Sequence, residues 1–547
     1  MEKQTLIVKG LFLLMLSALT VLFFSVPSFA GESTKGSINN VSYSFGGFYD
    51  ARALYAVNQT EDFYDLSGYP TMNTFQTINQ NLELHAMISY GNAAVLTEFH
   101  LTNDYNPTGL AGSGYGTNGW STLGYTAAPT GFNHDFNTFG LREAYFRLIT
   151  PVGMWMVGRM PIKFGMGVAV NTQADGIGDM LPFDSADIGV FAGVLIGNET
   201  TSYSSYANNP TGNQYPAIAT PAISPYYTHI QMGTIPTLDV VMLRPVNNFT
   251  GSLWLTEAHL NQFTSFPGPY YQPSTGSFVT SVDENIIYPT ANITFGGVSA
   301  TYDNGEGTVL NGELDVFKGH IICSNVAISN GECSAPTGLP VPPSSNNQYD
   351  AVSSYDLYLT GSQTINASIP LTAEFKFGIG APIAAGHYNF TYYSMLNNTR
   401  TLFGNVLGSD WQDIQINAPG TAYIYGPALA APLSNKWTLM LDLTENLSGG
   451  NSIEEAFIHQ SWLKTNLTVP GTNYSTQMFG GSNIGNEFDL DFTHQFSKRV
   501  SLEAFGSYVW TGDGVDSIVD APNGEPYSYS MVHKNVFALG SEVSFSF

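Results

Sequence analysis

The C-terminal segment alternates between apolar and polar side chains, and this pattern constrains the fold more than any other feature. The apolar positions are Val543, Phe545 and Phe547, and the polar positions are Glu542, Ser544 and Ser546. Because successive side chains of a β-strand point to opposite faces, the segment is predicted to be a strand with one apolar and one polar face. A sheet of such strands that crosses a lipid bilayer must close on itself, since lipid offers no partner for an unpaired edge. The C-terminus therefore predicts the last strand of a closed transmembrane sheet.

The first 30 residues have the organisation of a secretory signal peptide. A short basic start precedes an apolar stretch at residues 11–24, and Ser28-Phe29-Ala30 places small residues at the positions that a signal peptidase reads. We therefore predict a signal peptide at residues 1–30 and a mature chain at residues 31–547. The alternative, a transmembrane anchor, agrees less well with an apolar stretch this short.

We expect residues 31–547 to form one all-β domain, a single transmembrane antiparallel β-barrel of roughly 16–18 strands. Residues 82–90 and 93–101 alternate in polarity and flank Gly91-Asn92, which predicts a tight hairpin. Short turns are expected on the periplasmic side and long loops on the extracellular side. Residues 161–187 interrupt the strand pattern, and two interpretations stay open for them: an outer loop, or a loop folded into the lumen.

The chain is strongly acidic, with 43 Asp and Glu against 17 Lys and Arg and a net charge of −26. Such a charge repels nucleic acid, so we expect no nucleic-acid partner. Two interpretations of the acidic residues stay open. They line the lumen and attract cations, or they solubilise the outer loops.

The predicted hairpin places four ionisable residues on one polar face. A two-residue turn pairs Tyr90 with Ala93, so that His85 faces Glu98 and Glu83 faces His100. Two carboxylates and two imidazoles in this arrangement are candidate ligands for a divalent metal ion. The same residues also fit two cross-strand Glu–His pairs in a polar wall, and this interpretation is favoured.

Basic residues are scarce, and several of them gather in one region. Porins create a transverse electric field at a pore constriction by placing basic and acidic side chains opposite each other. We predict such a constriction here, formed by Arg142, Glu143, Arg147, Arg159, Lys163, Asp50 and Arg52. Asp175, Asp179 and Asp184 are candidates for additional acidic groups opposite the arginines. The alternative is a set of structural ion pairs across the wall, each of which would contribute little to stability.

The remaining motifs argue against a cofactor or an enzyme. Cys323 and Cys333 lie ten residues apart, and after export they are expected to form one local disulfide rather than a haem-attachment or metal site. The chain has no Gly-x-Ser-x-Gly, phosphate-binding glycine loop or His-Glu-x-x-His motif. We therefore expect no catalytic activity and no cofactor.

Three segments resemble known outer-membrane proteins. The strand ending in Phe545 and Phe547 resembles the signal that such barrels present to their assembly machinery. Residues 141–165 and 485–512 resemble the early strand pair and the C-terminal hairpin of porin-like barrels of the alginate-export family. The resemblance implies an 18-stranded monomeric channel. Exporters in that family resemble arginine-lined conduits, and this chain departs from them through its few arginines and its acidic excess.

These patterns together favour an outer-membrane, porin-like channel of a Gram-negative bacterium that passes small hydrophilic solutes, with a preference for cations or neutral molecules. Its expected partners are outer-membrane lipids, the barrel assembly machinery and small solutes. Two alternatives stay open: a surface adhesin or receptor barrel with a plugged lumen, and the barrel sheath of an electron-transfer conduit. The latter would need a separate cytochrome.

Overall fold

The computed structural model describes residues 34–38, 40–57, 74–105, 136–196, 231–246, 248–260, 270–272, 277–279, 290–323, 328–329, 332–333, 348–365, 370–382, 387–388, 403–404, 407, 433, 435–468, 475–477, 481–515, 518–520, 526–528 and 535–547. The predicted signal peptide lies outside these residues, so it stays a prediction. Among the described residues, no helix is long and apolar enough to cross a membrane.

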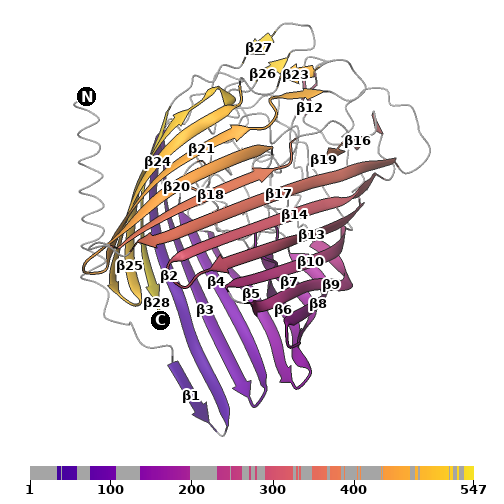
Figure 1. The fold of residues 1–547 in the computed structure, drawn as a ribbon, viewed down its shortest axis with the longest axis vertical. Coiled ribbons are helices and arrows are strands. Elements are labelled where there is room, and N and C mark those ends of the chain that lie inside the picture. The colour runs from indigo at the N-terminus through magenta and orange to yellow at the C-terminus, as the bar shows by residue number, and fades with distance from the viewer. Residues whose placement is uncertain are drawn as a thin grey trace.

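One large antiparallel sheet makes up most of the structure (Figure 1). Of the 20 strands in this sheet, β1 (Thr34–Ile38) and β19 (His387–Tyr388) are short marginal additions. The other 18 form one consecutive series: β2 (Val41–Val57), β3 (Thr74–Tyr90), β4 (Ala93–Tyr105), β5 (Phe136–Thr150), β6 (Gly153–Lys163), β7 (Asn171–Pro182), β8 (Ala186–Ile196), β9 (Gln231–Val246), β10 (Phe249–Leu260), β13 (Thr290–Asp303), β14 (Thr308–Cys323), β17 (Gln348–Ile365), β18 (Leu371–Gly380), β20 (Lys436–Leu447), β21 (Asn451–Trp462), β24 (Asn483–Ser497), β25 (Val500–Thr511) and β28 (Val536–Ser546).

The last strand of this series pairs with the first. β28 pairs with β2 over Phe48–Val57, while β2 pairs with β3 on its other side. Gly47 and Phe547 continue this ladder through two backbone hydrogen bonds of 2.9 and 3.0 Å. The sheet therefore returns to its starting strand, as the C-terminal pattern predicted, and its strand number confirms the upper end of the expected range.

Short and long connections alternate along the series. Turns as short as Gly91-Asn92 and Pro151-Val152 join pairs of strands at one end of the sheet. Small hairpins belong to the connections at the other end, and Figure 1 shows several of them gathered at the top. The additional elements are β11 (Tyr270–Gln272), β12 (Ser277–Val279), β15 (Ile328–Ser329), β16 (Glu332–Cys333), β22 (Asn466–Thr468), β23 (Ser475–Gln477), β26 (Ile518–Asp520), β27 (Pro526–Ser528) and the 3₁₀ helix η4 (Asp513–Val515).

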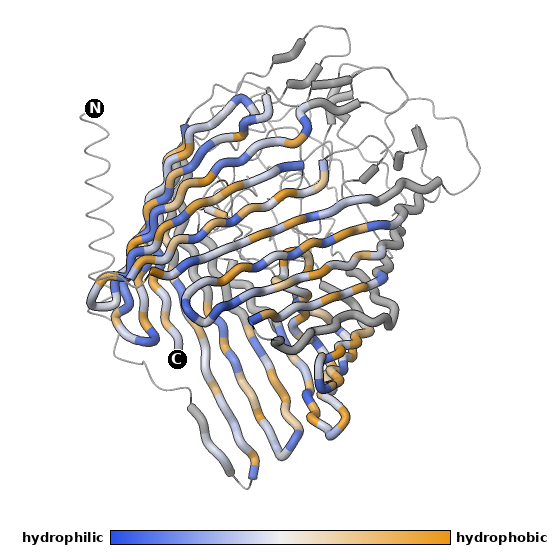
Figure 2. The backbone as a smooth tube through the Cα atoms, in the orientation of Figure 1, coloured by the Kyte–Doolittle hydropathy of each residue, from blue (hydrophilic) through white to orange (hydrophobic). Residues whose placement is uncertain are grey.

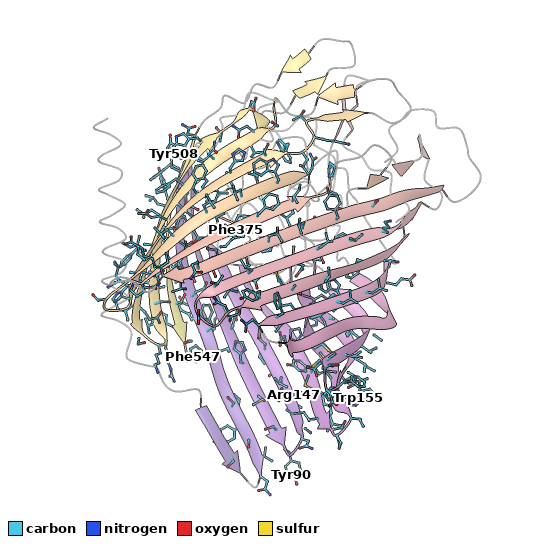
Figure 3. All side chains as sticks on the ribbon, viewed as in Figure 1. Tyr90, Arg147, Trp155, Phe375, Tyr508 and Phe547 are labelled. Atoms are coloured by element: carbon cyan, nitrogen blue, oxygen red, sulfur yellow. The ribbon has the colours of Figure 1, made fainter. Side chains whose placement is uncertain are left out.

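Hydrophobic and hydrophilic residues alternate along many strands of the sheet (Figure 2), so its two faces differ in polarity. Large apolar side chains are exposed on the outer face, including Phe45, Leu84, Ile88, Val95, Phe146, Trp155, Val157, Leu253, Leu255, Val316, Phe375, Leu441, Phe457, Leu490 and Trp510. Figure 3 shows Trp155 and Phe375 within this set. The intervening positions face inward and are largely polar. This alternation is the signature of a sheet with lipid outside and a polar interior.

Residues 161–187 are mostly strand rather than loop. They contain the end of β6, a turn at residues 164–170, the whole of β7, and a turn at residues 183–185. Of the two interpretations that the sequence left open, neither fits the whole segment. Only the turn at residues 164–170 folds inward.

Candidate functional site

The β6–β7 turn, residues 164–170, packs inside the sheet. The turn is held by two backbone hydrogen bonds, from Phe164 N to Val170 O (3.0 Å) and from Gly167 N to Phe164 O (2.8 Å). The side chains of Phe164, Val168 and Val170 are at most 3% exposed. They are therefore part of an apolar core inside the sheet, in a place where a simple wide pore would have water.

Aromatic side chains of β10 and β13 contact this turn. The ring of Phe164 stacks on Trp254 of β10 with a centroid separation of 6.5 Å. The same ring lies 6.4 Å from Phe295 of β13, which in turn stacks at 6.1 Å on Phe317 of β14. Burial of aromatic rings of this size contributes several kcal/mol, of order 3–5 for each ring lost to alanine. These contacts anchor the turn firmly on the inner face of β10 and β13.

A carboxylate of β14 fixes the backbone of the same turn. Glu313 Oε1 accepts a hydrogen bond of 2.9 Å from Val168 N, and Glu313 Oε2 accepts one from Met166 N. Glu313 itself is only 1% exposed. Because a buried carboxylate is costly unless it is hydrogen-bonded, these two N–H donors explain why Glu313 is tolerated there.

A second inward segment comes from the β18–β20 connection. Its described residues Phe403, Leu407 and Leu433 are almost completely buried. Phe403 meets Tyr358 of β17 edge to face at 5.7 Å. Leu407 N donates a hydrogen bond of 2.5 Å to Glu487 Oε2 of β24. A wall carboxylate therefore holds this segment by its backbone, as Glu313 holds the β6–β7 turn.

The inward face carries far more carboxylates than cations among the described side chains. Strand alternation places these carboxylates on that face: Asp50, Glu83, Glu98, Glu143, Glu313, Asp315, Asp356, Glu374, Asp442, Glu454, Glu487, Asp489, Asp491, Glu503 and Glu542. The described basic side chains on the same face are Arg147, Lys376 and Lys436. This charge balance favours the interpretation that the acidic residues line the lumen.

The predicted constriction residues are only partly brought together. Glu143 and Arg147 share the inner face of β5, and Glu143 lies opposite Glu98 in the ladder. Asp50 faces inward on β2 and is 2% exposed. For Arg142 and Arg52 only the backbone is described: Arg142 is the extra residue of a bulge between β4 and β5, and Arg52 pairs with Glu542. Lys163, the exposed last residue of β6, lies on the same strand face as Trp155 and Val157, which is the outer face, so the expectation that it lines a constriction is corrected.

Arg159 does not belong to this set. It forms a two-pronged salt bridge with Asp175 of β7, with both N–O distances at 2.9 Å. Along β6 and β7, Arg159 and Asp175 share the face of the exposed Val157 and Ile177. That face is the outer one, so the expectation that Arg159 lines a constriction is corrected. The sequence already placed Arg159 in register with Val157 and Trp155, which is the signal that identifies its face.

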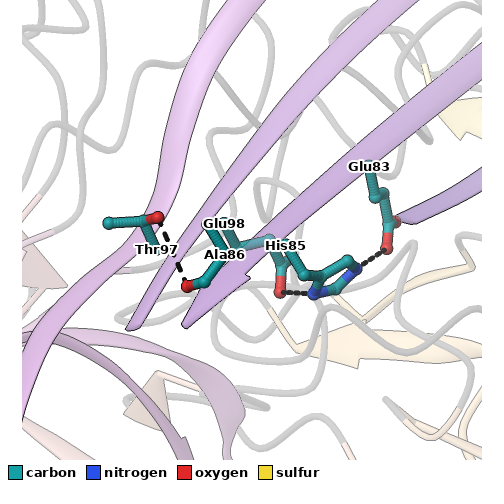
Figure 4. A network of polar contacts seen from close by, with 5 residues as sticks. All are labelled: Glu83, His85, Ala86, Thr97 and Glu98. Atoms are coloured by element: carbon teal, nitrogen blue, oxygen red, sulfur yellow. Dashed lines mark hydrogen bonds and ion pairs between the residues drawn. The ribbon is translucent and has the colours of Figure 1, made fainter. Parts of the chain in front are cut away.

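The predicted Glu–His hairpin has the expected register. Glu83 pairs with His100 and His85 pairs with Glu98. His85 lies between two carboxylates (Figure 4). Its Nδ1 atom is 3.3 Å from Glu98 Oε2, and its Nε2 atom is 3.8 Å from Glu83 Oε2. For His100 only the backbone is described. The described side chains contain no group of three or more His, Cys, Asp or Glu placed to hold a metal ion, so the metal site stays a prediction and the bridging imidazole is the observed arrangement.

The predicted disulfide also stays a prediction. Cys323 ends β14, and Cys333 ends β16 in a small hairpin. The backbone of both residues is described, and both belong to the β14–β17 connection or its border.

The sequence analysis did not identify the buried carboxylates of the inner face as a candidate functional site. Glu313, Asp315 and Asp356 are each at most 1% exposed. The signal in the sequence was present, since Glu313 and Asp315 alternate with the apolar Leu314 and Val316. What the pattern lacked was any sign that two inward segments would cover these residues.

A closed antiparallel sheet with an apolar outer face and a polar, charged inner face defines the fold as that of a transmembrane β-barrel. No protein-family model matches the chain, and no curated protein matches it in sequence.

Several solved structures share the arrangement at low similarity. Pseudomonas aeruginosa OccK5 (OpdH) matches with a TM-score of 0.41 and 8% identity, over 92% of this chain and 98% of that chain. The outer membrane protein OprD from Pseudomonas aeruginosa matches with a TM-score of 0.40 and 11% identity, over 92% of this chain and 94% of that chain. OmpT, an outer membrane protein of Vibrio cholerae, matches with a TM-score of 0.34 and 6% identity, over 92% of this chain and 99% of that chain.

Proposed function

We propose that the protein is a bacterial outer-membrane channel through which small hydrophilic solutes diffuse passively, with a preference for cations and neutral molecules. The excess of carboxylates on the inner face is the observation that carries this proposal. In a water-filled lumen, such a wall concentrates cations and repels anions. The apolar outer face would lie in lipid, and the aromatic terminus would be the part that the assembly machinery reads.

The two inward segments supply the restriction on solute size. The β6–β7 turn and the β18–β20 residues are anchored on different strands of the wall by aromatic contacts and by backbone hydrogen bonds to Glu313 and Glu487. Segments held in this way reduce the open cross-section of the lumen. The resemblance to the alginate-export family would imply an arginine-lined path. The acidic inner face of this chain favours cations instead.

Single-channel conductance and reversal potential in a planar bilayer under a salt gradient test this proposal. We expect steady open channels whose reversal potential has the sign of cation selectivity, and whose selectivity weakens as salt screens the wall. Steady anion selectivity would contradict the acidic-lumen mechanism. An absence of conductance from correctly folded protein would overturn the channel itself and favour an adhesin, a receptor or a conduit sheath.

A further inference from the structure

Two buried carboxylates face each other on neighbouring strands of the inner wall. Asp315 of β14 is the direct ladder partner of Asp356 of β17. Asp315 is 1% exposed and Asp356 is 0% exposed. Apart from the neighbouring carboxyl group of Glu313, which lies beside Asp315, no described residue offers a hydrogen-bond partner to the oxygens of either side chain. Among the described residues, no Lys, Arg or His forms an ion pair with them.

Such a pair is stable only if a cation or a proton compensates its charge. An unpaired buried carboxylate is strongly unfavourable, and two like charges directly opposite in a ladder repel each other. The neighbouring Glu313 shows how the wall satisfies a buried carboxylate, because it receives the two backbone N–H groups of Met166 and Val168. Among the described residues, no equivalent backbone N–H donor reaches Asp315 or Asp356. The pair is therefore arranged to meet something other than these donors.

The surroundings of the pair supply one more oxygen atom and one donor, the Trp254 indole N–H. A Cβ on Gly380, the ladder partner of Asp356, would lie 2.9 Å from Asp356 Oδ1 and 1.7 Å from the Leu433 carbonyl oxygen. A Cβ on Gly297 would lie 2.4 Å from Asp315 Oδ1 and 2.3 Å from Trp254 Cζ2. The Trp254 indole N–H is buried and has no acceptor among the described residues. Two carboxylates, a carbonyl oxygen and a donor suited to a water molecule therefore converge here.

We propose that Asp315 and Asp356 bind a divalent cation with a preference for hard oxygen ligands, Ca²⁺ or an ion of the same class, which keeps part of its water shell. Such ions take carboxylate, carbonyl and water oxygens together. Only two carboxylates are directly involved, which agrees with the absence of any described group of three or more acidic or His side chains around one metal position.

The cation would link the two inward segments. Asp315 lies two residues from Glu313, which holds the β6–β7 turn, and Asp356 lies beside Leu433 of the β18–β20 connection. A bound ion would neutralise the wall between the two anchors and stabilise both. This inference does not depend on the proposed transport, because it concerns binding and stability and is measured without conductance.

A lanthanide titration tests the site directly. Tb³⁺ takes Ca²⁺-type oxygen sites and emits when a nearby tryptophan is excited, and Trp254 is next to Asp315. The full-length folded protein in detergent, first stripped with a chelator, is titrated with Tb³⁺ and then with Ca²⁺, and its thermal unfolding is followed with and without Ca²⁺. The double variant D315N/D356N removes both charges with little change in shape. The control E503Q/E542Q removes two carboxylates that also face each other in a ladder, between β25 and β28.

We expect saturable Tb³⁺ emission that Ca²⁺ displaces, and a Ca²⁺-dependent rise in unfolding temperature, in the wild-type protein and in the control. Both signals should be lost in D315N/D356N. The competing way to neutralise the pair is a proton shared within the group of Asp315, Asp356 and Glu313. Stripped wild-type protein that neither gains stability from Ca²⁺ nor gives tryptophan-sensitised emission would overturn the cation site in favour of that proton. Equal Ca²⁺ effects in wild type and D315N/D356N would place the ion elsewhere and overturn it as well.

Discussion

Glu313 accepts a hydrogen bond from the backbone N–H of Val168 at 2.9 Å, across a sequence separation of 145 residues. This contact joins a strand of the wall to a turn that lies inside it. It explains why a buried carboxylate and an apolar turn occur together in the interior of a barrel. It also identifies the residue whose removal should release the turn without disturbing the strands.

The variant E313Q should loosen the β6–β7 turn. An amide keeps one acceptor oxygen but turns an NH₂ group toward one of the two backbone donors, so one buried hydrogen bond is lost. We expect the free energy of unfolding to fall by roughly 1–3 kcal/mol, the range for an unsatisfied buried donor. In bilayers, the open-channel current should become larger or noisier. The matched control is E306Q, which makes the same change at an exposed turn residue of the same β13–β14 hairpin; an equal effect in both variants would contradict the anchoring role.

The double variant E454Q/D491N should reduce cation selectivity. Glu454 and Asp491 are ladder partners on the inner faces of β21 and β24, and both are partly exposed. Because each charge contributes to the potential of the lumen, removing both should shift the reversal potential toward zero. Glu455 is the next residue on β21 and points to the outer face, so E455Q is the control. An unchanged reversal potential in E454Q/D491N would show that ions do not pass this part of the wall.

Arg147 and Arg159 should differ in their effect on the channel. Arg147 faces inward, and the variant R147Q should therefore increase the preference for cations. Arg159 pairs with Asp175 on the outer face. R159Q should therefore leave the reversal potential unchanged while lowering stability, because it leaves the Asp175 carboxylate without its partner on the face that meets lipid. Reversal potentials and denaturant unfolding measured on both variants check this. A selectivity change in R159Q alone would reverse the assignment of faces.

The contrast between these two arginines shows how much of the site can be predicted from the sequence. The register of the β3–β4 hairpin could be predicted residue by residue, because a two-residue turn at Gly91-Asn92 fixes every later pair. The same alternation rule assigns Arg159 to the apolar face of Val157, and the prediction failed where the clustering of basic residues was given more weight than that rule.

The interior could not be predicted in the same way. Strand alternation shows that Glu313 and Asp315 face inward, but it does not show what covers them. Their burial depends on Val168 and Leu433, which are distant in sequence and belong to connections between strands. Local periodicity contains no information about which connection folds inward, so the luminal anchors became visible only in the structure.

The variant F547A should impair assembly more than stability. The backbone of Phe547 pairs with Gly47 through hydrogen bonds of 2.9 and 3.0 Å, and its ring covers Gly47, where a Cβ would lie 2.5 Å from Phe547 Cζ. Alanine keeps the backbone ladder but removes the aromatic group that the assembly machinery is expected to read. We expect a several-fold lower amount of folded protein in outer-membrane fractions, together with near-normal unfolding of the protein refolded in detergent. The variant F545A, which loses a ring packed at 6.2 Å on Tyr49 within the wall, separates the two effects because it should lower stability as well. Normal assembly of F547A in cells would show that the terminal ring serves closure of the sheet and not recognition.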